Sequence, residues 1–448
     1  MSMVTFDRFL FAYTIGSHII LVTMSISLIL LITILEFLRI VKDDPAYAEL
    51  ISRLKKVFVI SFGVGTASGI VMAVELVNLF PGFMTLVSET GAVNLLYAEI
   101  FAFFLETIAL VIYVYFEGAY KWRYANVSLS FTILLGTLLS AVFITMLNAW
   151  MNTPNGFSLA NYVETGAVTG INPWAPFITA STGAELAHMA FTTILAGIMV
   201  NGAYFSYKYI REGSGPMASP YRIMVRLTGI ISIIAVIFVG VTGSNEMVSI
   251  LVNQPVKYAA FDLNYFPGTN LPEKLFGTIQ NGSVVGGIQI PGLQSMLAEL
   301  ETKITVLPGL AQFPVSVWPP LIVHSLFDLM VAGGLLLGLF LFVIFLFFLL
   351  RKDVVKYRVL LYGQIIMGIF TFIIYEIGWS ADEIGRQPWI VYNVMSVSKA
   401  SNYSSGLLVP GYLIIAFYLI LVPATFYFFA RTFNSSARVR KTEGGGGH

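Results

Sequence analysis

Nine long apolar runs shape this chain of 448 residues. Each run is about 18 residues or longer, the length at which an α-helix can cross the hydrocarbon core of a bilayer. Charged residues make up 11% of the chain, against about 25% in a soluble domain. We therefore expect an all-α integral membrane protein whose nine transmembrane helices pack in bundles. The spans are predicted near residues 9–38, 58–80, 92–116, 126–149, 185–207, 224–242, 320–350, 357–379 and 407–430.

Basic residues are distributed unevenly among the segments between these runs. Of the 25 Lys and Arg residues, 19 lie in segments that would share one side of the membrane. Cytoplasmic segments carry the excess of basic residues, so the N-terminus is predicted outside and the C-terminus inside. The longest connection, between the sixth and seventh helices, is then also outside.

This topology divides the chain into three parts. Residues 1–242 would hold helices one to six, residues 243–319 an extracytoplasmic loop, and residues 320–443 helices seven to nine with a short cytoplasmic tail. Apolar patches in the loop favour an ordered segment that covers a site. Residues 444–448 read GGGGH and look like a linker and tag remnant, which we exclude from the fold.

The composition restricts the chemistry. No cysteine is present, which excludes disulfides, thiolate metal sites and iron–sulfur clusters held by Cys. A net charge of +1 gives no reason to expect nucleic acid as a partner. Any metal must therefore be held by His, Met or carboxylate groups. Outside the tag remnant the histidines are His18, His188 and His324, and His324 is expected in the wet interface at the outer end of the seventh span.

Two histidines and a methionine are candidate metal ligands. His18 is nine residues into the first predicted span, roughly 14 Å below its outer end, where a neutral imidazole can bind haem iron or hydrogen-bond a neighbouring helix. His188, in the first turn of the fifth span, can be a ligand or an interfacial residue. Met330 is often core filler in such a position, but the nearby acid Asp328 favours a ligand. A haem held by His and Met is low-spin and suits electron transfer.

Two acids share one face of the Phe-rich third span. Glu99 and Glu106 are seven residues apart, about 10 Å along a helix axis. Ser140 reaches a comparable depth in the fourth span. Acids with hydroxyl neighbours inside a membrane are typical of proton relays. The alternative is a structural hydrogen bond between helices.

The eighth span ends in an unusual cluster of charges at residues 376–389 (EIGWSADEIGRQPW). Each ionised group at membrane depth costs roughly 2.5 to 3.5 kcal/mol. Glu376, Trp379 and Glu383 share a helix face, with Arg386 one turn further on. A carboxylate can bind haem iron axially, and an Arg can pair with a haem propionate. The alternative is a salt-bridged interfacial cap within an aromatic belt.

Together these residues resemble subunit I of cytochrome bd quinol oxidase, over most of the chain. Residues 385–389 (GRQPW), with 376–379 (EIGW) before them, resemble the signature at the end of that family's eighth helix. Nine spans with the N-terminus outside is also the family topology. Further matching segments fall in the family's order: 8–14 (RFLFAYT) followed by His18, 102–106 (AFFLE), 139–141 (LSA), 148–154 (NAWMNTP), 187–188 (AH) and 254–262 (QPVKYAAFD).

The resemblance implies three haems and their ligands. His188 and Met330 would hold a low-spin haem b. His18 and Glu383 would be the axial ligands of a high-spin haem b and of a haem d or a further haem b. Trp379 would pack between haems, and Arg386 would pair with a propionate.

The resemblance also implies an activity and its setting. Lys257 and Asp262 would bind or deprotonate quinol in the outer loop, and Glu99, Glu106 and Ser140 would belong to the proton network. Quinol would be oxidised outside and O₂ reduced to water with cytoplasmic protons, generating a proton motive force without pumping. The expected location is a prokaryotic plasma membrane. The expected partners are a second large membrane subunit and single-helix small subunits.

Some positions depart from the family pattern. Asp328 stands where well-known members have an Arg, and Asp262 replaces a Glu. The second span, at 71–80 (VMAVELVNLF), lacks the usual acid after its Met, and the loop is short, as in the short-loop branch. Three alternatives therefore stay open: an electron-transfer cytochrome b, a relative with another electron donor or acceptor, and a transporter that uses intramembrane acids without haem.

Overall fold

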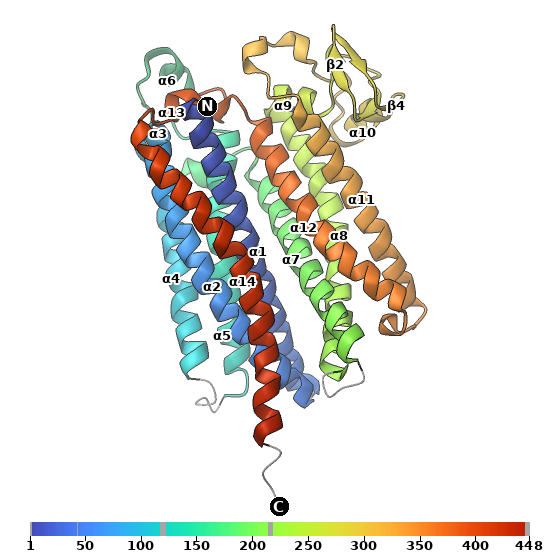
Figure 1. Cartoon of the computed structure of the whole chain (residues 1–448). Coiled ribbons are helices and arrows are strands. Elements are labelled where there is room, and N and C mark those ends of the chain that lie inside the picture. Colours follow the sequence, from blue (N-terminus) through green and yellow to red (C-terminus); the bar gives the residue numbers. More distant parts are fainter. Residues whose placement is uncertain (1, 43, 117–121, 214–217, 444–448) are drawn as a thin grey trace, which may run out of the picture.

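The chain forms a bundle of long helices capped at one end by short elements (Figure 1). The computed structural model describes residues 2–42, 44–116, 122–213 and 218–443, so the predicted tag remnant at 444–448 lies outside the described residues. Within these ranges nine helices are long and apolar enough to cross a membrane. The predicted nine-helix, all-α membrane fold is thereby confirmed. The helices are α1 (Met3–Lys42), α2 (Pro45–Leu79), α4 (Val93–Tyr115), α5 (Ala125–Asn152), α7 (Thr182–Glu212), α8 (Ala218–Asn253), α11 (Ile322–Leu349), α12 (Arg358–Gly385) and α14 (Leu408–Glu443).

These helices pack as two groups of four with α14 on the outside. In the first group α1 packs on α2 and α5, and α4 packs on α5; in the second, α7 packs on α8 and α12, and α11 packs on α12. The groups meet where α1 contacts α7, and α14 covers α1 and α2. Small residues allow the close approaches: a Cβ at Gly197 would lie 2.5 Å from Ser27 Cβ, and one at Gly368 would lie 2.5 Å from the Met199 carbonyl oxygen.

The segment between α8 and α11 is ordered and lies at the same end as the N-terminus (Figure 1). The helix α8 ends at Asn253, beyond the predicted end at residue 242, because Ile250 and Leu251 are buried against the core beneath the loop. The segment contains two antiparallel strand pairs, β1 with β4 and β2 with β3. Its elements are α9 (Pro255–Phe261), β1 (Glu273–Leu275), β2 (Thr278–Gln280), β3 (Ser283–Val285), β4 (Ile288–Ile290) and α10 (Leu293–Thr302).

Buried polar contacts hold this segment on α11. Asp328 accepts a hydrogen bond from the backbone N–H of Phe276. It also pairs with His324, whose Nε2 lies 3.2 Å from Asp328 Oδ2. His324 Nδ1 contacts the Phe261 carbonyl oxygen at 2.5 Å. His324 is 1% exposed, so the expectation of a wet interfacial position is wrong, because the loop folds over it.

Shorter elements complete the same end of the bundle. The helix α3 packs against α2 and α13, and the strands β5 and β6 form a third antiparallel pair. A second apolar core, which includes Phe83 and Trp150, lies among these elements. The elements are α3 (Pro81–Glu89), α6 (Leu159–Thr165), β5 (Trp389–Val391), β6 (Met395–Ser396) and α13 (Val397–Ala400).

Candidate functional site

A large cavity lies inside the second helix group, beneath the loop. Its volume is about 1210 Å³, larger than the roughly 300 to 1,000 Å³ of ordinary ligand pockets. Four of the predicted site residues line it, from four different elements: His188 on α7, Asp262 after α9, Met330 on α11 and Trp379 on α12. The cavity is therefore large enough for a big apolar cofactor and offers metal ligands on opposing helices.

His188 is held by a hydroxyl and a glycine on α8. The Thr242 hydroxyl donates to the Phe238 carbonyl at 2.7 Å and lies 3.3 Å from His188 Nδ1. A hydroxyl has one hydrogen, so Thr242 accepts from the imidazole and Nδ1 carries the proton. A Cβ on Gly243 would lie 3.1 Å from His188 Cε1, so this glycine leaves room for the ring. His188 Nε2 is then left with a free lone pair.

His18 is held in the same way on α2. The Ser68 hydroxyl donates to the Gly65 carbonyl at 2.8 Å and lies 2.8 Å from His18 Nδ1. A Cβ on Gly69 would lie 3.3 Å from His18 Cε1. The same reasoning protonates Nδ1 and leaves Nε2 with a free lone pair.

The two histidines thus share one arrangement. Each lies on the first helix of a hairpin of consecutive spans, facing a hydroxyl–glycine dipeptide on the second helix, at 68–69 and at 242–243. A metal-ligating His typically donates its other ring N–H to such a partner, which fixes the tautomer. The donor sets therefore fit haem iron. The dipeptides were not singled out from the sequence, because a Ser-Gly or Thr-Gly pair does not show which helix it faces.

Met330 lies against α12 next to Trp379. A Cβ on Gly378 would be 2.9 Å from Met330 Sδ, so the glycine before Trp379 makes room for the thioether. Met330 and Trp379 both line the cavity that contains His188. This places a soft sulfur ligand and an indole at the same cavity wall.

Asp262 lies at the loop side of the cavity and is 4% exposed. Burial and the neighbouring charge of Glu273 raise the pKa of Asp262 to about 8, although Lys274 opposes the shift. The amide of Gln294, on α10, donates to Asp262 Oδ2 at 2.5 Å. Lys274 Nζ donates to the Asp262 carbonyl at 3.1 Å. Such a carboxyl can accept a proton near neutral pH, and Gln294 was not predicted from the sequence.

Lys257 does not face the cavity directly. Its ammonium, on α9, pairs with Asp382 on α12, and Asp382 lines the cavity while Lys257 does not. Asp382 was not among the predicted site residues, and the structure places it in this ion pair. A change at Lys257 would therefore act on the cavity through Asp382.

The end of α12 holds a second ion pair. Arg386, 3% exposed, pairs with Glu383, whose side chain is 37% exposed. Arg386 also donates to Asn148 and, at 2.9 Å, to Asn152 Oδ1. Asn152 Nδ2 in turn donates to Glu185 Oε1 at 2.9 Å. A polar chain thus joins the predicted carboxylate ligand to α5 and α7.

The acids of α4 each meet one hydroxyl of α5. Ser140 Oγ donates to Glu99 Oε1 at 2.8 Å, as its comparable depth suggested. Thr137 Oγ1 donates to Glu106 Oε1 at 2.7 Å, a partner that was not predicted. A Cβ on Gly136 would lie 2.8 Å from Glu106 Cβ, so this glycine allows the close approach of the two helices.

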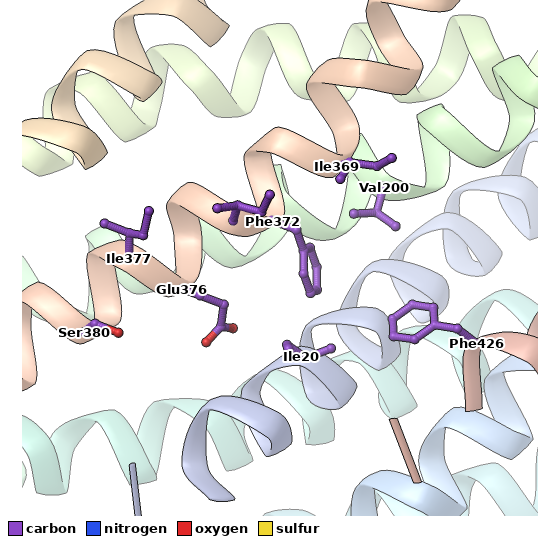
Figure 2. Close-up of a pocket in the computed structure, with 9 residues that line it drawn as sticks. Ile20, Val200, Ile369, Phe372, Glu376, Ile377, Ser380 and Phe426 are labelled. Carbon is purple, nitrogen blue, oxygen red and sulfur yellow. The ribbon is translucent and has the colours of Figure 1, made fainter. Parts of the chain in front are cut away.

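Glu376 faces a second, smaller cavity between α1, α7, α12 and α14. Its volume is about 580 Å³, and apart from Glu376 and Ser380 its walls are apolar. Figure 2 shows the carboxylate directed into this space, among Ile20, Phe372 and Ile377. Glu376 Oε1 is buried without a hydrogen-bond partner. A carboxyl oxygen that is buried without a partner is energetically costly, so Glu376 is an unusual residue in this otherwise apolar wall.

Comparison with known proteins relates this architecture to one family. The model of the family described as cytochrome bd terminal oxidase subunit I matches residues 6–437. The chain is 30% identical over 401 residues to the putative cytochrome bd menaquinol oxidase subunit I of Bacillus subtilis (strain 168), covering 87% of each protein. It is 24% identical over 464 residues to the cytochrome bd ubiquinol oxidase subunit 1 of the same organism, covering 98% of this chain and 95% of the relative.

A solved structure shares the whole fold. A chain of the bd oxidase from Geobacillus thermodenitrificans superposes with a TM-score of 0.88 at 29% sequence identity. The match covers 97% of this chain and 99% of that chain. The similarity therefore includes the loop end as well as the helix bundle.

Proposed function

The chain belongs to the cytochrome bd terminal oxidase subunit I family, and from this premise we propose that it carries the haems of an oxidase that transfers electrons from quinol to O₂. The observation that carries the proposal is the cavity of about 1210 Å³ in which His188, Met330, Trp379 and Asp262 meet. Metal ligands and a proton-accepting acid in one cavity suit a reaction that removes both electrons and protons from its substrate.

We propose as haem ligands the residues whose surroundings suit the binding of haem iron. His188 and Met330 would hold a low-spin haem b, and His18 and Glu383 the two high-spin haems, one of them haem d or a second haem b. When bound, the haems would supply one-electron transfer and an iron able to bind O₂. By accepting from Nδ1–H, Thr242 and Ser68 would leave the imidazole Nε2 atoms unprotonated, which is the form that binds iron.

Quinol oxidation is assigned to the loop side of the cavity. Asp262 accepts a proton from the quinol hydroxyl, and Gln294 orients the carboxylate through its hydrogen bond. Lys257 pairs with Asp382 and holds its carboxylate at the cavity wall, so a neutral ion pair would lie beside the substrate. Trp379 packs at the same wall, on the helix that leads to Glu383.

Proton supply is assigned to α4 and α5. Glu106 with Thr137 and Glu99 with Ser140 form two stations about 10 Å apart along α4, each with a hydroxyl in hydrogen-bond contact. The basic segments at the end opposite the loop support a cytoplasmic location for that end. Protons would be released at the loop side and taken up from the cytoplasm, which separates charge without a pump.

The setting follows from the family. We place the chain in a prokaryotic plasma membrane, with its loop outside. A second large membrane subunit and single-helix small subunits are proposed partners, since the relatives are described as subunit I of bd oxidases. The exposed apolar residues of α4, such as Phe101 at 73% and Phe104 at 57%, suit a face covered by lipid or by such a partner.

The test is oxygen consumption by the purified membrane protein. With a reduced quinol as donor, we expect consumption of O₂ at two quinols per O₂, with no hydrogen peroxide. Release of peroxide, or haem reduction by quinol without oxygen consumption, would contradict four-electron reduction. The second outcome would favour an electron-transfer cytochrome b.

The role of the two hydroxyl groups that contact the histidines can be tested by substitution. In Thr242→Ala and Ser68→Ala the imidazole loses its Nδ1 acceptor but keeps Nε2. Loss of such a partner typically lowers metal affinity or activity about 10- to 100-fold. We expect haem content to fall and the reduction potential to shift, measured by redox titration of the visible spectrum. Ser68→Thr, which keeps the hydroxyl, should retain the parental spectrum. Alanine variants with unchanged potential and haem content would disprove the role.

A further inference from the structure

The connection between α11 and α12 lies at the end of the bundle opposite the loop (Figure 1) and carries an excess of positive charge. Residues 351–358 read RKDVVKYR, which is four basic residues and one acid. The connection is anchored, because Val354 and Val355 are buried in the large apolar core of the helix bundle. Its short helix η4 (Val354–Lys356) contacts α8, α11 and α12. The charges are therefore held at a fixed place beside the start of α8.

Two arginines of α8 join these charges through Asp353. Arg222 pairs with the Asp353 carboxylate, and Arg226 Nη2 lies 2.9 Å from Asp353 Oδ1. The side chain of Asp353 is 10% exposed, whereas those of Arg222 and Arg226 are 45% and 42% exposed. One carboxylate cannot neutralise two guanidinium groups, and each guanidinium has five N–H donors. Both arginines therefore keep exposed donors for an anion from outside the chain.

The balance of charge here differs from that at the same end of the first helix group. There, Arg39 lies 2.9 Å from Glu36, and Arg53 lies 2.6 Å from Glu49, so that each of these cations has its own acid. Beside α8, six basic residues share one acid, which gives a formal charge of +5. We call these six residues the basic cluster: Arg222, Arg226, Arg351, Lys352, Lys356 and Arg358.

The surface next to the basic cluster is apolar. Along α8, Arg222 and Arg226 are followed at the same spacing of four residues by Ile230 and Ile234, which are 47% and 51% exposed. Residues four apart are neighbours on one side of a helix. On α12, the exposed Val359 follows directly after the basic connection. The surface thus changes from cationic to apolar towards the middle of the bundle, as a phospholipid changes from headgroup to acyl chain.

We propose that the basic cluster binds the phosphate of an anionic phospholipid from the cytoplasmic leaflet, with an acyl chain along Ile230 and Ile234. Basic pockets between membrane helices on the cytoplasmic side suit anionic headgroups, and a guanidinium binds phosphate oxygens bidentately. The bound lipid joins α8 to the α11–α12 connection and so stabilises the second helix group. The inference does not depend on the proposed oxidase reaction.

The first experiment locates the lipid by fluorescence quenching. The chain has no cysteine, so Ile230→Cys gives one attachment site for a bimane label in bilayers of phosphatidylcholine and phosphatidylglycerol. Phe131→Cys, at an exposed position near the same end of α5, is the matched control. With brominated acyl chains on one lipid at a time, we expect phosphatidylglycerol to quench the label at 230 at least about fivefold more effectively, the contribution of a single basic residue. Both lipids should quench the label at 131 equally, and equal quenching at 230 as well would overturn the proposal.

The second experiment changes the charge of the cluster in both directions. The double variant Arg222→Gln/Arg226→Gln should abolish the preference for phosphatidylglycerol at position 230. Lys42→Gln/Arg123→Gln, which removes the same charge from the first helix group, should leave the preference unchanged.

Asp353→Asn separates lipid binding from ion pairing within the chain. It removes both ion pairs but makes the cluster more positive, so we expect the preference for phosphatidylglycerol to increase. A lower preference in Asp353→Asn, or a preference that persists in the double arginine variant, would overturn the proposal. Helical circular dichroism and elution volume check the folding of each variant, and Asp353→Asn decides alone where the double arginine variant does not fold.

The third experiment distinguishes a lipid from a free anion. Dioctanoyl phosphatidylglycerol, added to the protein in a neutral detergent, should raise Tm, and glycerol phosphate at the same concentration should not, because it has no acyl chain to cover the isoleucines. An equal rise with glycerol phosphate would overturn the assignment to a lipid. None of these measurements uses haem or quinol, so a failure of the proposed function would leave their results unchanged.

Discussion

Replacing His188 with alanine should abolish the low-spin haem signal and lower quinol-dependent oxygen consumption by more than about 100-fold. The expected loss is this large because removing only the hydrogen-bond partner of a metal-ligating His typically lowers metal affinity or activity about 10- to 100-fold. The reason is that His188 Nε2 has a lone pair directed by the Thr242 contact and lines the large cavity with Met330. Alanine provides no ligand. The measurement is the α-band of the dithionite-reduced protein, together with oxygen uptake.

Thr242→Ala is the matched comparison for this loss. It keeps the imidazole and removes only the acceptor of Nδ1–H, so it should retain a shifted low-spin band while His188→Ala has none. Folding is checked by the elution volume and helical circular dichroism of each variant. A folded His188→Ala protein with the parental α-band would show that another residue holds the low-spin haem.

Replacing Asp262 with asparagine should lower kcat/KM for quinol by about 10²- to 10⁴-fold, the usual contribution of a general base. Asparagine keeps the shape and an oxygen for the Gln294 contact but cannot accept the quinol proton. The haem spectrum should not change, because Asp262 is not a proposed ligand. Stopped-flow reduction of the haems by quinol measures the effect directly.

The pH dependence tests the same residue. The pKa of Asp262 is raised to about 8 by burial and by Glu273, so the carboxyl is protonated and inactive as a base at lower pH. We therefore expect kcat/KM to rise with pH up to about 8 and then to level, and Asp262→Asn to lose this rise. Asp262→Glu, which restores the longer acid expected from the family resemblance, should retain it. A parental profile that is flat between pH 6 and 9 would contradict a base role for Asp262.

The helices could be predicted well from the sequence because the hydropathy of a segment indicates directly whether it can span a membrane. Each of the nine predicted spans overlaps one long apolar helix among the described residues. The end of α8 was missed because residues 243–253 contain polar side chains, and burial of Ile250 and Leu251 under the loop extends the helix. The strand pairs of the loop were not predicted, since strands of three residues are too short to show an alternation of polar and apolar side chains.

The site was partly predictable for a similar reason. Titratable or metal-binding groups are conspicuous in apolar runs, so His18, Glu99 and Glu106 could be singled out. Their partners could not: Thr137 and Ser68 are ordinary hydroxyls, and only packing shows which acid or imidazole each one meets. Gln294 reaches Asp262 across 32 residues of loop, a contact that no local pattern indicates.

Whether this chain carries the proposed haems is tested most directly by one absorption measurement. The purified membrane protein is reduced with dithionite, and spectra are recorded before and after addition of carbon monoxide. The account predicts a low-spin b-type band that carbon monoxide leaves unchanged, because His188 and Met330 would both hold that haem iron, and a high-spin signal that carbon monoxide shifts. A protein without haem absorption, or with haem that never responds to carbon monoxide, would contradict it.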